Sequence, residues 1–235
     1  MTHDLRTPLN AINGFADILF RSEDCDAKTR KEFAAYIHES GQHLLSLVNQ
    51  LLDMSKIEAG AMELEIDTVS VETLMRRATT VVQPIYQEKG VHLQVSCLPE
   101  DVEVDVDKQA IIRVFINLMS NAAKFTNKDK SVYFEARRAA NGDILVAVRD
   151  EGRGMRPEDA TRVLQPYIQA QVRDRNDGSG QGTGLGLPIS KQLVELHGGR
   201  LRLDSQLDIG TTVTISIPAF RVLNASIADP VDPGA

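Results

Sequence analysis

Three polar side chains with helical spacing could hold a metal ion and phosphate groups. Asn117, Asn121 and Lys124 stand at positions i, i+4 and i+7 of the segment NLMSNAAKFT, so a helix here places them on one face. Two amide oxygens and an ammonium suit a hydrated Mg²⁺ with its phosphates, because magnesium takes oxygen ligands and keeps several waters. A lone asparagine on a helix is usually a surface or capping residue, so this interpretation depends on the motifs nearby.

Two glycine-rich segments could bring backbone close to a nucleotide. Residues 182–187, GTGLGL, open a predicted helix, where glycines let N–H groups approach an anion and the helix dipole favours phosphate. Asp150 follows a predicted strand, and its carboxylate can accept a hydrogen bond from an exocyclic amine while Gly152 and Gly154 permit close approach. A carboxylate in this position could recognise the amino group of adenine. Each segment also has an ordinary alternative, a tight turn, and the first lies too late in the chain for a dinucleotide-binding βαβ unit.

The N-terminal part of the chain predicts two amphipathic helices. Apolar residues recur every three or four positions over 5–19 and again over 33–52, with a polar break at 22–26 and a terminating glycine at Gly60. Pro8 is expected to bend the first helix. Because two helices cannot enclose a core, the stripes predict a helical hairpin that dimerises into a four-helix bundle.

The rest of the chain combines strand and helix periodicities. Alternating apolar and polar residues predict strands, with a hairpin turn at Asn141-Gly142, over 62–66, 92–97, 132–137, 143–149, 200–204 and 211–217. Three- and four-residue spacing predicts helices over 71–89, 108–125 and 185–197. Strands and helices do not alternate strictly, and the hairpins need antiparallel pairs. We therefore expect an α+β sandwich of helices on a mixed sheet.

Composition narrows the class of protein. The 235 residues include 26 Lys and Arg against 33 Asp and Glu, a net charge of -7 with no basic block, which disfavours a general binder of nucleic acid or anionic membranes. No segment is apolar enough to span a membrane. Cys25 and Cys97 lack metal-ligand spacing and are expected to be buried small hydrophobes in a reducing compartment. The opening MTHDLRTPLN starts within helical sequence, so we expect a fragment of a longer protein.

Taken in order, these motifs resemble those of sensor histidine kinases of two-component systems. NLMSNAAKFT is similar to the N box of the GHKL ATP-binding fold, DEGRGM to its first glycine box and GTGLGL to its second. HDLRTP, at residues 3–8, resembles the phosphoacceptor motif of the HisKA class. Residues 164–167 match the F box loosely, and the polar segment 157–181 corresponds to a mobile lid over the nucleotide. The resemblance covers residues 1–220.

The resemblance implies a domain organisation. Residues 1–62 correspond to the dimerisation and histidine phosphotransfer domain, and residues 63–220 to the catalytic ATP-binding domain, a GHKL-type sandwich. Residues 221–235 are expected to form a disordered tail. The first domain would make the protein a homodimer. No contact with nucleic acid or membrane is expected from this fragment.

By the same resemblance, individual residues have implied roles. His3 is the phosphoacceptor, Asp4 orients its imidazole or takes its proton, and Thr7 positions water for dephosphorylating the partner. Asn121 is the principal ligand of Mg²⁺, and Asp150 reads the adenine of ATP. The remaining residues implied to bind the nucleotide are Asn117, Lys124, Phe125, Gly152, Gly154, Gly182, Thr183, Gly184, Leu185 and Gly186.

The chemistry of imidazole agrees with this assignment. A neutral imidazole nitrogen is a competent nucleophile near neutral pH and can attack the γ-phosphoryl group of ATP held by magnesium and backbone amides, giving a phosphoimidazole. The resemblance implies transfer of that group to an aspartate in the receiver domain of a separate response regulator. It also implies a bacterial cytoplasmic module, often attached to a membrane receptor. His38, His43, His92 and His197 have no comparable sequence context and are expected to be structural or surface residues.

Two departures from the family pattern leave alternatives open. Asp4 stands where the family commonly has Glu, and its side chain is one methylene shorter, which reduces its reach toward the imidazole. Together with the loosely matched F box, this keeps open a catalytically impaired signalling scaffold with the same fold. A third hypothesis is a GHKL ATPase of the gyrase or mismatch-repair type, but those relatives have a Glu at the position of Asn117.

Overall fold

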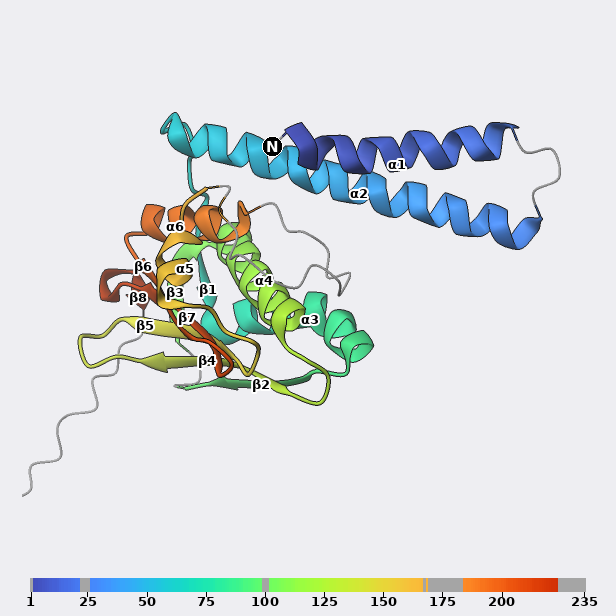
Figure 1. Cartoon of the computed structure of the whole chain (residues 1–235). Helices are drawn as coiled ribbons and strands as arrows, with labels where there is room; N and C mark the ends of the chain where they lie inside the picture. The colour runs from blue at the N-terminus through green and yellow to red at the C-terminus, as the bar shows by residue number, and fades with distance from the viewer. Residues whose placement is uncertain (1, 22–25, 99–101, 167, 169–183, 224–235) are drawn as a thin grey trace, which may run out of the picture.

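The computed structural model describes residues 2–21, 26–98, 102–166, 168 and 184–223 of the chain. A helical hairpin lies along the helical side of an α+β domain, and one end of the hairpin projects beyond that domain (Figure 1). The predicted order, helical hairpin first and α+β sandwich second, is therefore confirmed.

The hairpin consists of two long helices, α1 (Thr2–Arg21) and α2 (Ala27–Glu58). Asp26 begins α2: its carboxylate accepts a hydrogen bond from the backbone N–H of Thr29 at 2.8 Å and so satisfies a donor of the first turn. On α1, the ring centroid of Phe15 lies 5.3 Å from that of Phe33 and 5.0 Å from that of Tyr36. These aromatic contacts hold the two helices side by side.

Five strands form a mixed sheet in the order β2-β4-β5-β7-β6. Their bounds are β2 (His92–Cys97), β4 (Ser131–Arg138), β5 (Ile144–Asp150), β6 (Arg200–Gln206) and β7 (Gly210–Ile217). β2 runs parallel to β4, and the other neighbouring pairs are antiparallel. The predicted hairpin turn joins β4 to β5, and Gly142 there has a φ of 87°, which glycine adopts without strain.

Three shorter strands form a second sheet in the order β1-β3-β8. Their bounds are β1 (Ile66–Ser70), β3 (Glu103–Asp107) and β8 (Val222–Leu223). Strands β3 and β8 were not predicted. Residues 103–107 alternate acids and valines, the pattern of a half-buried strand, so β3 was detectable, whereas the two residues of β8 give no periodic signal. The strand predicted from 62 begins instead at Ile66, where pairing with Asp107 of β3 starts.

The predicted disordered tail, residues 221–235, begins too early. After the short 3-10 turn η1 (Ala219–Arg221), β8 pairs with β3 in antiparallel register. Arg221 anchors this segment, since its guanidinium donates to the carbonyl oxygens of His197 at 2.6 Å and Asp105 at 2.9 Å. The chain therefore remains part of the domain through β8, and residues 224–235 lie outside the described part.

Helices cover one face of the five-stranded sheet (Figure 1). Their bounds are α3 (Val71–Lys89), α4 (Lys108–Phe125), α5 (Pro157–Arg162) and α6 (Gly186–Leu196). Helices α3 and α4 coincide with the predicted ranges, α6 is one residue shorter at each end, and α5 was not predicted. Across the described residues, no helix has both the length and the apolarity of a membrane span.

The core lies between these helices and the sheet, and it fixes α4 in place. The hydroxyl of buried Tyr86 on α3 donates to the carbonyl oxygen of Met119 at 2.8 Å, and burial raises the pKa of this phenol, so it stays a donor. On the sheet side, the rings of Phe115 and Phe134 pack edge to face, with their centroids 5.2 Å apart. Helix α4 is thus held from both α3 and β4.

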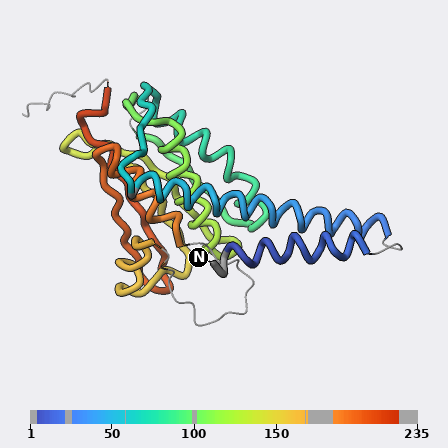
Figure 2. The backbone as a smooth tube through the Cα atoms, turned by 90° about the horizontal axis from the view of Figure 1, so that it is seen from above, coloured from blue at the N-terminus to red at the C-terminus, as the bar shows by residue number. Residues whose placement is uncertain are grey.

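The C-terminal part of α2 packs on the α+β domain beside α4 and α6 (Figure 2). Met54 is 7% exposed and belongs to the core of that domain, with Leu51 and Ile57 packed against it. Asp53 forms an ion pair with Arg113 of α4. The hairpin and the α+β domain therefore share apolar contacts and a partly buried ion pair.

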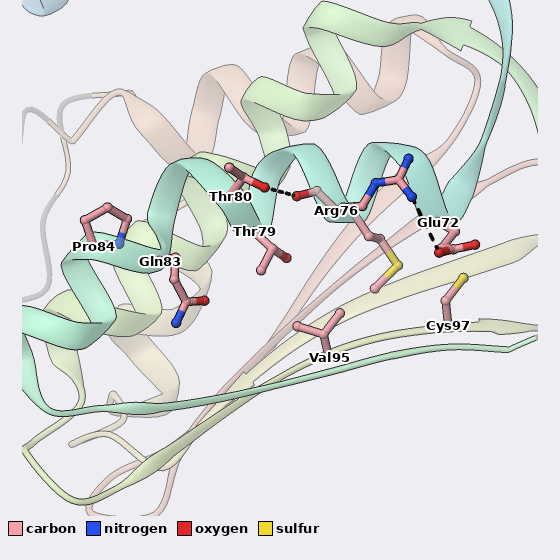
Figure 3. A pocket seen from close by; sticks show the side chains of 9 residues that line it. Glu72, Arg76, Thr79, Thr80, Gln83, Pro84, Val95 and Cys97 are labelled. Atoms are coloured by element: carbon pink, nitrogen blue, oxygen red, sulfur yellow. Dashed lines mark hydrogen bonds and ion pairs between the residues drawn. The ribbon is translucent and has the colours of Figure 1, made fainter.

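A groove of about 870 Å³ lies between α3 and β2, on a different side of α3 from α4 (Figure 3). Along its rim, Arg76 pairs with Glu72 at 3.9 Å and its carbonyl oxygen accepts from the hydroxyl of Thr80 at 2.9 Å. Val95 and Cys97 of β2 form the opposite wall. None of the residues predicted to bind the nucleotide lines this groove.

His197 ends α6 and joins it to the start of α4. The residue is 1% exposed, its Nδ1 lies 2.7 Å from the carbonyl oxygen of Leu193, and its Nε2 accepts the N–H of Asp107 at 3.0 Å. This pairing requires a neutral ring that carries its proton on Nδ1. The Asp107 carboxylate in turn caps α4 by accepting from the N–H of Ala110 at 3.0 Å. His197 is thus a structural residue, one of the two roles expected for it.

The buried ring of His197 predicts a pH dependence of stability. Burial lowers its pKa below the ordinary value of 6.5, so the unfolded chain binds more protons and the free energy of unfolding falls as the pH drops through 6.5. His197→Gln keeps a donor and an acceptor but cannot titrate there. In urea unfolding at neutral and mildly acidic pH, we expect the wild type to lose more stability on acidification than the variant. Equal losses would contradict the assigned protonation state.

Candidate functional site

Two asparagines on α4 occupy one face of the helix and have different surroundings. The Nδ2 of Asn117 donates to the hydroxyl of Ser190 on α6 at 2.8 Å, and its Oδ1 accepts from the Nδ2 of Asn121 at 3.4 Å. The amide of Asn117 is therefore used within the protein. The Oδ1 of Asn121 receives no hydrogen bond from any described residue, so it is the oxygen of this pair that a cation can use.

The N-terminus of α6 meets the same face of α4. Gly186, the first residue of α6, packs so closely against Asn117 that a Cβ added to it would lie 3.0 Å from the Asn117 Cγ. Leu185 before it is buried and makes no capping side-chain bond, and Gly184 has a φ of 69°. Within the described part of the chain, no side chain caps the N–H groups of Gly186 and Leu187 next to the asparagines, an arrangement that favours an anion.

Asp150 ends β5 near the C-terminal end of α4. Its Oδ1 accepts hydrogen bonds from the N–H groups of Gly152 at 2.9 Å and Thr211 at 3.1 Å. Burial raises the pKa of Asp150, and these two bonds oppose that shift. Because Oδ2 receives no bond from the described residues, one oxygen remains to accept an external donor. Gly152 is required here, since a Cβ would lie 2.7 Å from Oδ1.

Positive charges gather at the C-terminal end of α4. Nζ of Lys124 lies 5.4 Å, and Cζ of Arg153 4.6 Å, from the centroid of the Phe125 ring. Desolvation lowers the pKa of Lys124, and the nearby charges of Lys89 and Arg153 lower it further. The ammonium of Lys89 caps the helix by donating to the carbonyl oxygens of Ala123 at 3.2 Å and Lys124 at 3.3 Å.

Sequence reasoning missed four residues of this arrangement. Ser190 was detectable, since it lies one helical turn after Gly186. Arg153 was inside a quoted motif but had no assigned role. Lys89 and Thr211 are distant in sequence from the residues they contact, so no local pattern could indicate them.

Several predicted residues are not brought to this site by the described structure. His3 and Asp4 lie in the first turns of α1, and their side chains are outside the described part, whereas Thr7 is exposed on the same helix. Gly182 and Thr183 also lie outside it. The predicted lid range, 157–181, starts as α5, and most of the remainder lies outside the described residues.

The donor set fits one class of metal. Within the described ranges, no three His, Cys, Asp or Glu side chains gather into a cluster that could hold a metal by themselves. A single amide oxygen on Asn121, close to a helix N-terminus suited to anions, matches a hard cation that brings its own waters and shares phosphate oxygens. The geometry therefore suits a Mg²⁺–phosphate ligand rather than a resident transition metal.

Comparison with known proteins assigns both parts of the chain. Residues 1–60 match the family model of the His Kinase A (phospho-acceptor) domain. Residues 106–221 match the model of the histidine kinase-, DNA gyrase B- and HSP90-like ATPases. The first match coincides with the hairpin and the second contains α4, Asp150 and α6.

Two proteins of Caulobacter vibrioides are similar over most of the chain. The non-motile and phage-resistance protein is 40% identical over 223 residues, which are 93% of this chain and 26% of that protein. Histidine protein kinase DivJ is 39% identical over 221 residues, which are 94% of this chain and 36% of DivJ. The chain thus spans well under half the length of these relatives.

Solved structures show the same arrangement of domains. Full-length ShkA in complex with AMPPNP superposes with a TM-score of 0.71 at 30% identity, over 92% of this chain and 44% of that one. ThkA in complex with the response regulator TrrA has a TM-score of 0.69 at 21% identity, over 93% of this chain and 59% of that one, and this likeness concerns the fold alone. With its phospho-acceptor hairpin and its GHKL-type domain in this order, the chain belongs to the sensor histidine kinases of two-component systems.

Proposed function

We propose that the chain is the catalytic core of a sensor histidine kinase that binds Mg-ATP, phosphorylates His3 and passes the phosphoryl group to an aspartate of a response regulator. The observation that carries the proposal is the arrangement along α4. In the C-terminal half of α4, an asparagine oxygen lies near the N-terminus of α6, and one turn further along, at the C-terminal end of α4, lies a half-buried carboxylate with an available oxygen. The site thus has a subsite for a cation and an anion at one place and a hydrogen-bonding subsite at another. Such a pair of subsites suits a purine nucleotide with its phosphates.

In this proposal each group has one task. The Oδ2 of Asp150 accepts a hydrogen bond from the amino group of adenine. Lys124 contacts phosphate, and Asn121 holds Mg²⁺. Asn117 positions Asn121 and α6 through its two hydrogen bonds. When bound, the metal neutralises charge on the phosphates. Residues 184–186, with Gly182 and Thr183 before them, give the phosphates backbone N–H donors.

The phosphoryl step belongs to the hairpin. A neutral ring nitrogen of His3 forms a bond to the γ-phosphorus as the bond from phosphorus to the β,γ-bridging oxygen breaks, which releases ADP. Asp4 accepts the proton on the other ring nitrogen. In the same scheme, Thr7 helps a water molecule dephosphorylate the response regulator. We assign residues 1–62 to dimerisation and phosphotransfer, and residues 63–223 to ATP binding.

We also infer that the hairpin makes the chain a homodimer through a four-helix bundle. Leu45, Val48 and Leu52 of α2 are 56%, 40% and 55% exposed, and at 100° per residue they lie within a narrow arc of the helix. Leu51 and Met54 lie on another side of α2, toward the α+β domain. This clustering of exposed apolar side chains on one face of a long helix favours association, and a second hairpin would supply the partner.

Removal of the acceptor tests the proposed phosphorylation. With ATP radiolabelled in its γ-phosphoryl group, we expect the wild type to acquire acid-labile label, as phosphohistidine does, and His3→Gln to acquire none while it keeps its affinity for ADP. His43→Gln, which changes an exposed histidine of α2, is the matched control and should label like the wild type. Label on His3→Gln would place the acceptor elsewhere, and an unlabelled wild type that binds ADP would favour the scaffold hypothesis.

The role of Asp150 can be tested by a neighbouring pair of substitutions. A hydrogen bond to a charged group contributes about 1.5–3 kcal/mol, so Asp150→Asn should weaken ADP binding about ten- to a hundredfold in calorimetry. Glu151→Gln is the control, because Glu151 accepts from the N–H of Ser131 and the hydroxyl of Tyr133 instead. Wild-type affinity in Asp150→Asn would contradict adenine recognition by this carboxylate.

Charges on the exposed face of α2 should break the proposed bundle. Leu45→Glu combined with Leu52→Glu would bury two carboxylates without partners, so light scattering should report a monomer where the wild type is a dimer. His43→Glu, at an exposed polar position of the same helix, adds a negative charge outside this face and should remain a dimer. A monomeric wild type at micromolar concentration would contradict the dimer itself.

A further inference from the structure

The residues along α4 divide the proposed nucleotide site into two ends. Asn117 and Asn121 lie beside the N-terminus of α6, whereas Phe125 is one turn beyond Asn121, at the helix end that meets the Asp150 turn. The carbonyl oxygen of Phe125 accepts the N–H of Arg153 at 3.3 Å. Phe125 and Arg153 therefore belong to the Asp150 end of the site, away from the end suited to Mg²⁺ and phosphate.

The backbone around Arg153 is held on both sides. Besides its bond to α4, its carbonyl oxygen accepts the N–H of Asp208 in the β6–β7 turn at 2.7 Å. The preceding residue, Gly152, is buried against the Phe125 carbonyl and the Asp150 carboxylate. The direction in which the Arg153 side chain leaves the turn is thus fixed by three elements.

The guanidinium of Arg153 lies over an aromatic ring. Its Cζ lies 4.6 Å from the Phe125 centroid, and within the described ranges no carboxylate forms an ion pair with it. The nearest acid in sequence, Glu151, is engaged by Ser131 and Tyr133. Phe125 itself is 37% exposed, so this half-buried cation lies over a ring that is open to solvent.

We propose that Arg153, held over Phe125, is a purine-contacting residue that forms a side wall of the adenine subsite. A guanidinium packs on π faces, and adenine offers a second such face beside Phe125. The proposal rests on the proposed function, because it assumes that Asp150 reads adenine. It differs from a phosphate-binding role in one respect: the contact is made with the base, so it persists in a ligand that has no phosphate.

Substitution of Arg153 should weaken binding of adenosine and ADP by the same factor. A cation–π contact of this kind corresponds to about a three- to thirtyfold change in affinity. With ADP affinity measured by calorimetry and adenosine affinity by its competition with ADP, we expect Arg153→Leu to show that loss for both ligands. Arg153→Lys, which keeps the charge without the planar group, should recover part of it.

Arg149→Leu is the matched control, because Arg149 lies over the Tyr133 ring at 3.7 Å on the same strand as Asp150 and should leave both affinities unchanged. Phe125→Leu should weaken the binding of both ligands. The double variant, Phe125→Leu with Arg153→Leu, should lose less affinity than the product of the two single fold-losses.

Loss of ADP affinity with adenosine affinity unchanged would make Arg153 a phosphate contact and overturn the proposal, as would unchanged affinity for both. Absence of ADP binding in the wild type would instead contradict the proposed function. A circular dichroism spectrum and thermal midpoint close to those of the wild type would show that Arg153→Leu is folded.

Discussion

The position of α4 is the constraint on which the proposed site depends. Its N-terminus is capped by Asp107, whose own N–H donates to the buried ring of His197, and its C-terminal carbonyl oxygens accept from Lys89. Between these ends, Tyr86 and the Phe134 ring hold the helix against α3 and the sheet. A rotation of α4 by one residue, about 100°, would turn its asparagines away from α6 and from the subsites they serve.

Close approach of backbone, rather than side-chain reach alone, brings the other elements to α4. Gly186 lets the start of α6 touch Asn117, and Gly152 lets the Asp150 turn touch the carbonyl of Phe125. A side chain at either position would separate two elements by about the radius of a methyl group. The glycines of the two motifs therefore act at the contacts between elements, and the positions of the N–H donors and of the carboxylate follow from those contacts.

Elements that local sequence patterns define were predicted well, and contacts between residues distant in the sequence were not. Helices α3 and α4 were located to the residue, because Ser70 and Asp107 cap them and their apolar stripes are long. The three-stranded sheet was largely missed: β3 was not located although its acids and valines alternate, and β8, only two residues long, is defined by its pairing with β3 over more than a hundred residues. In the site, the motifs indicated Asp150 and Asn121, but not that Lys89 and Thr211 hold their surroundings.

Helix α2 shows how one apolar stripe can serve two partners. The sequence presents its apolar residues as a single pattern, yet Leu51 and Met54 pack on the α+β domain while Leu45 and Leu52 face outward. Asp53, which forms the partly buried ion pair with α4, lies on α2 between these two apolar faces. The same helix would therefore form the bundle and hold the nucleotide domain, with the two interfaces on different faces of one element. In the proposed function, the phosphoacceptor on α1 and the nucleotide beside α4 would be positioned relative to each other through α2.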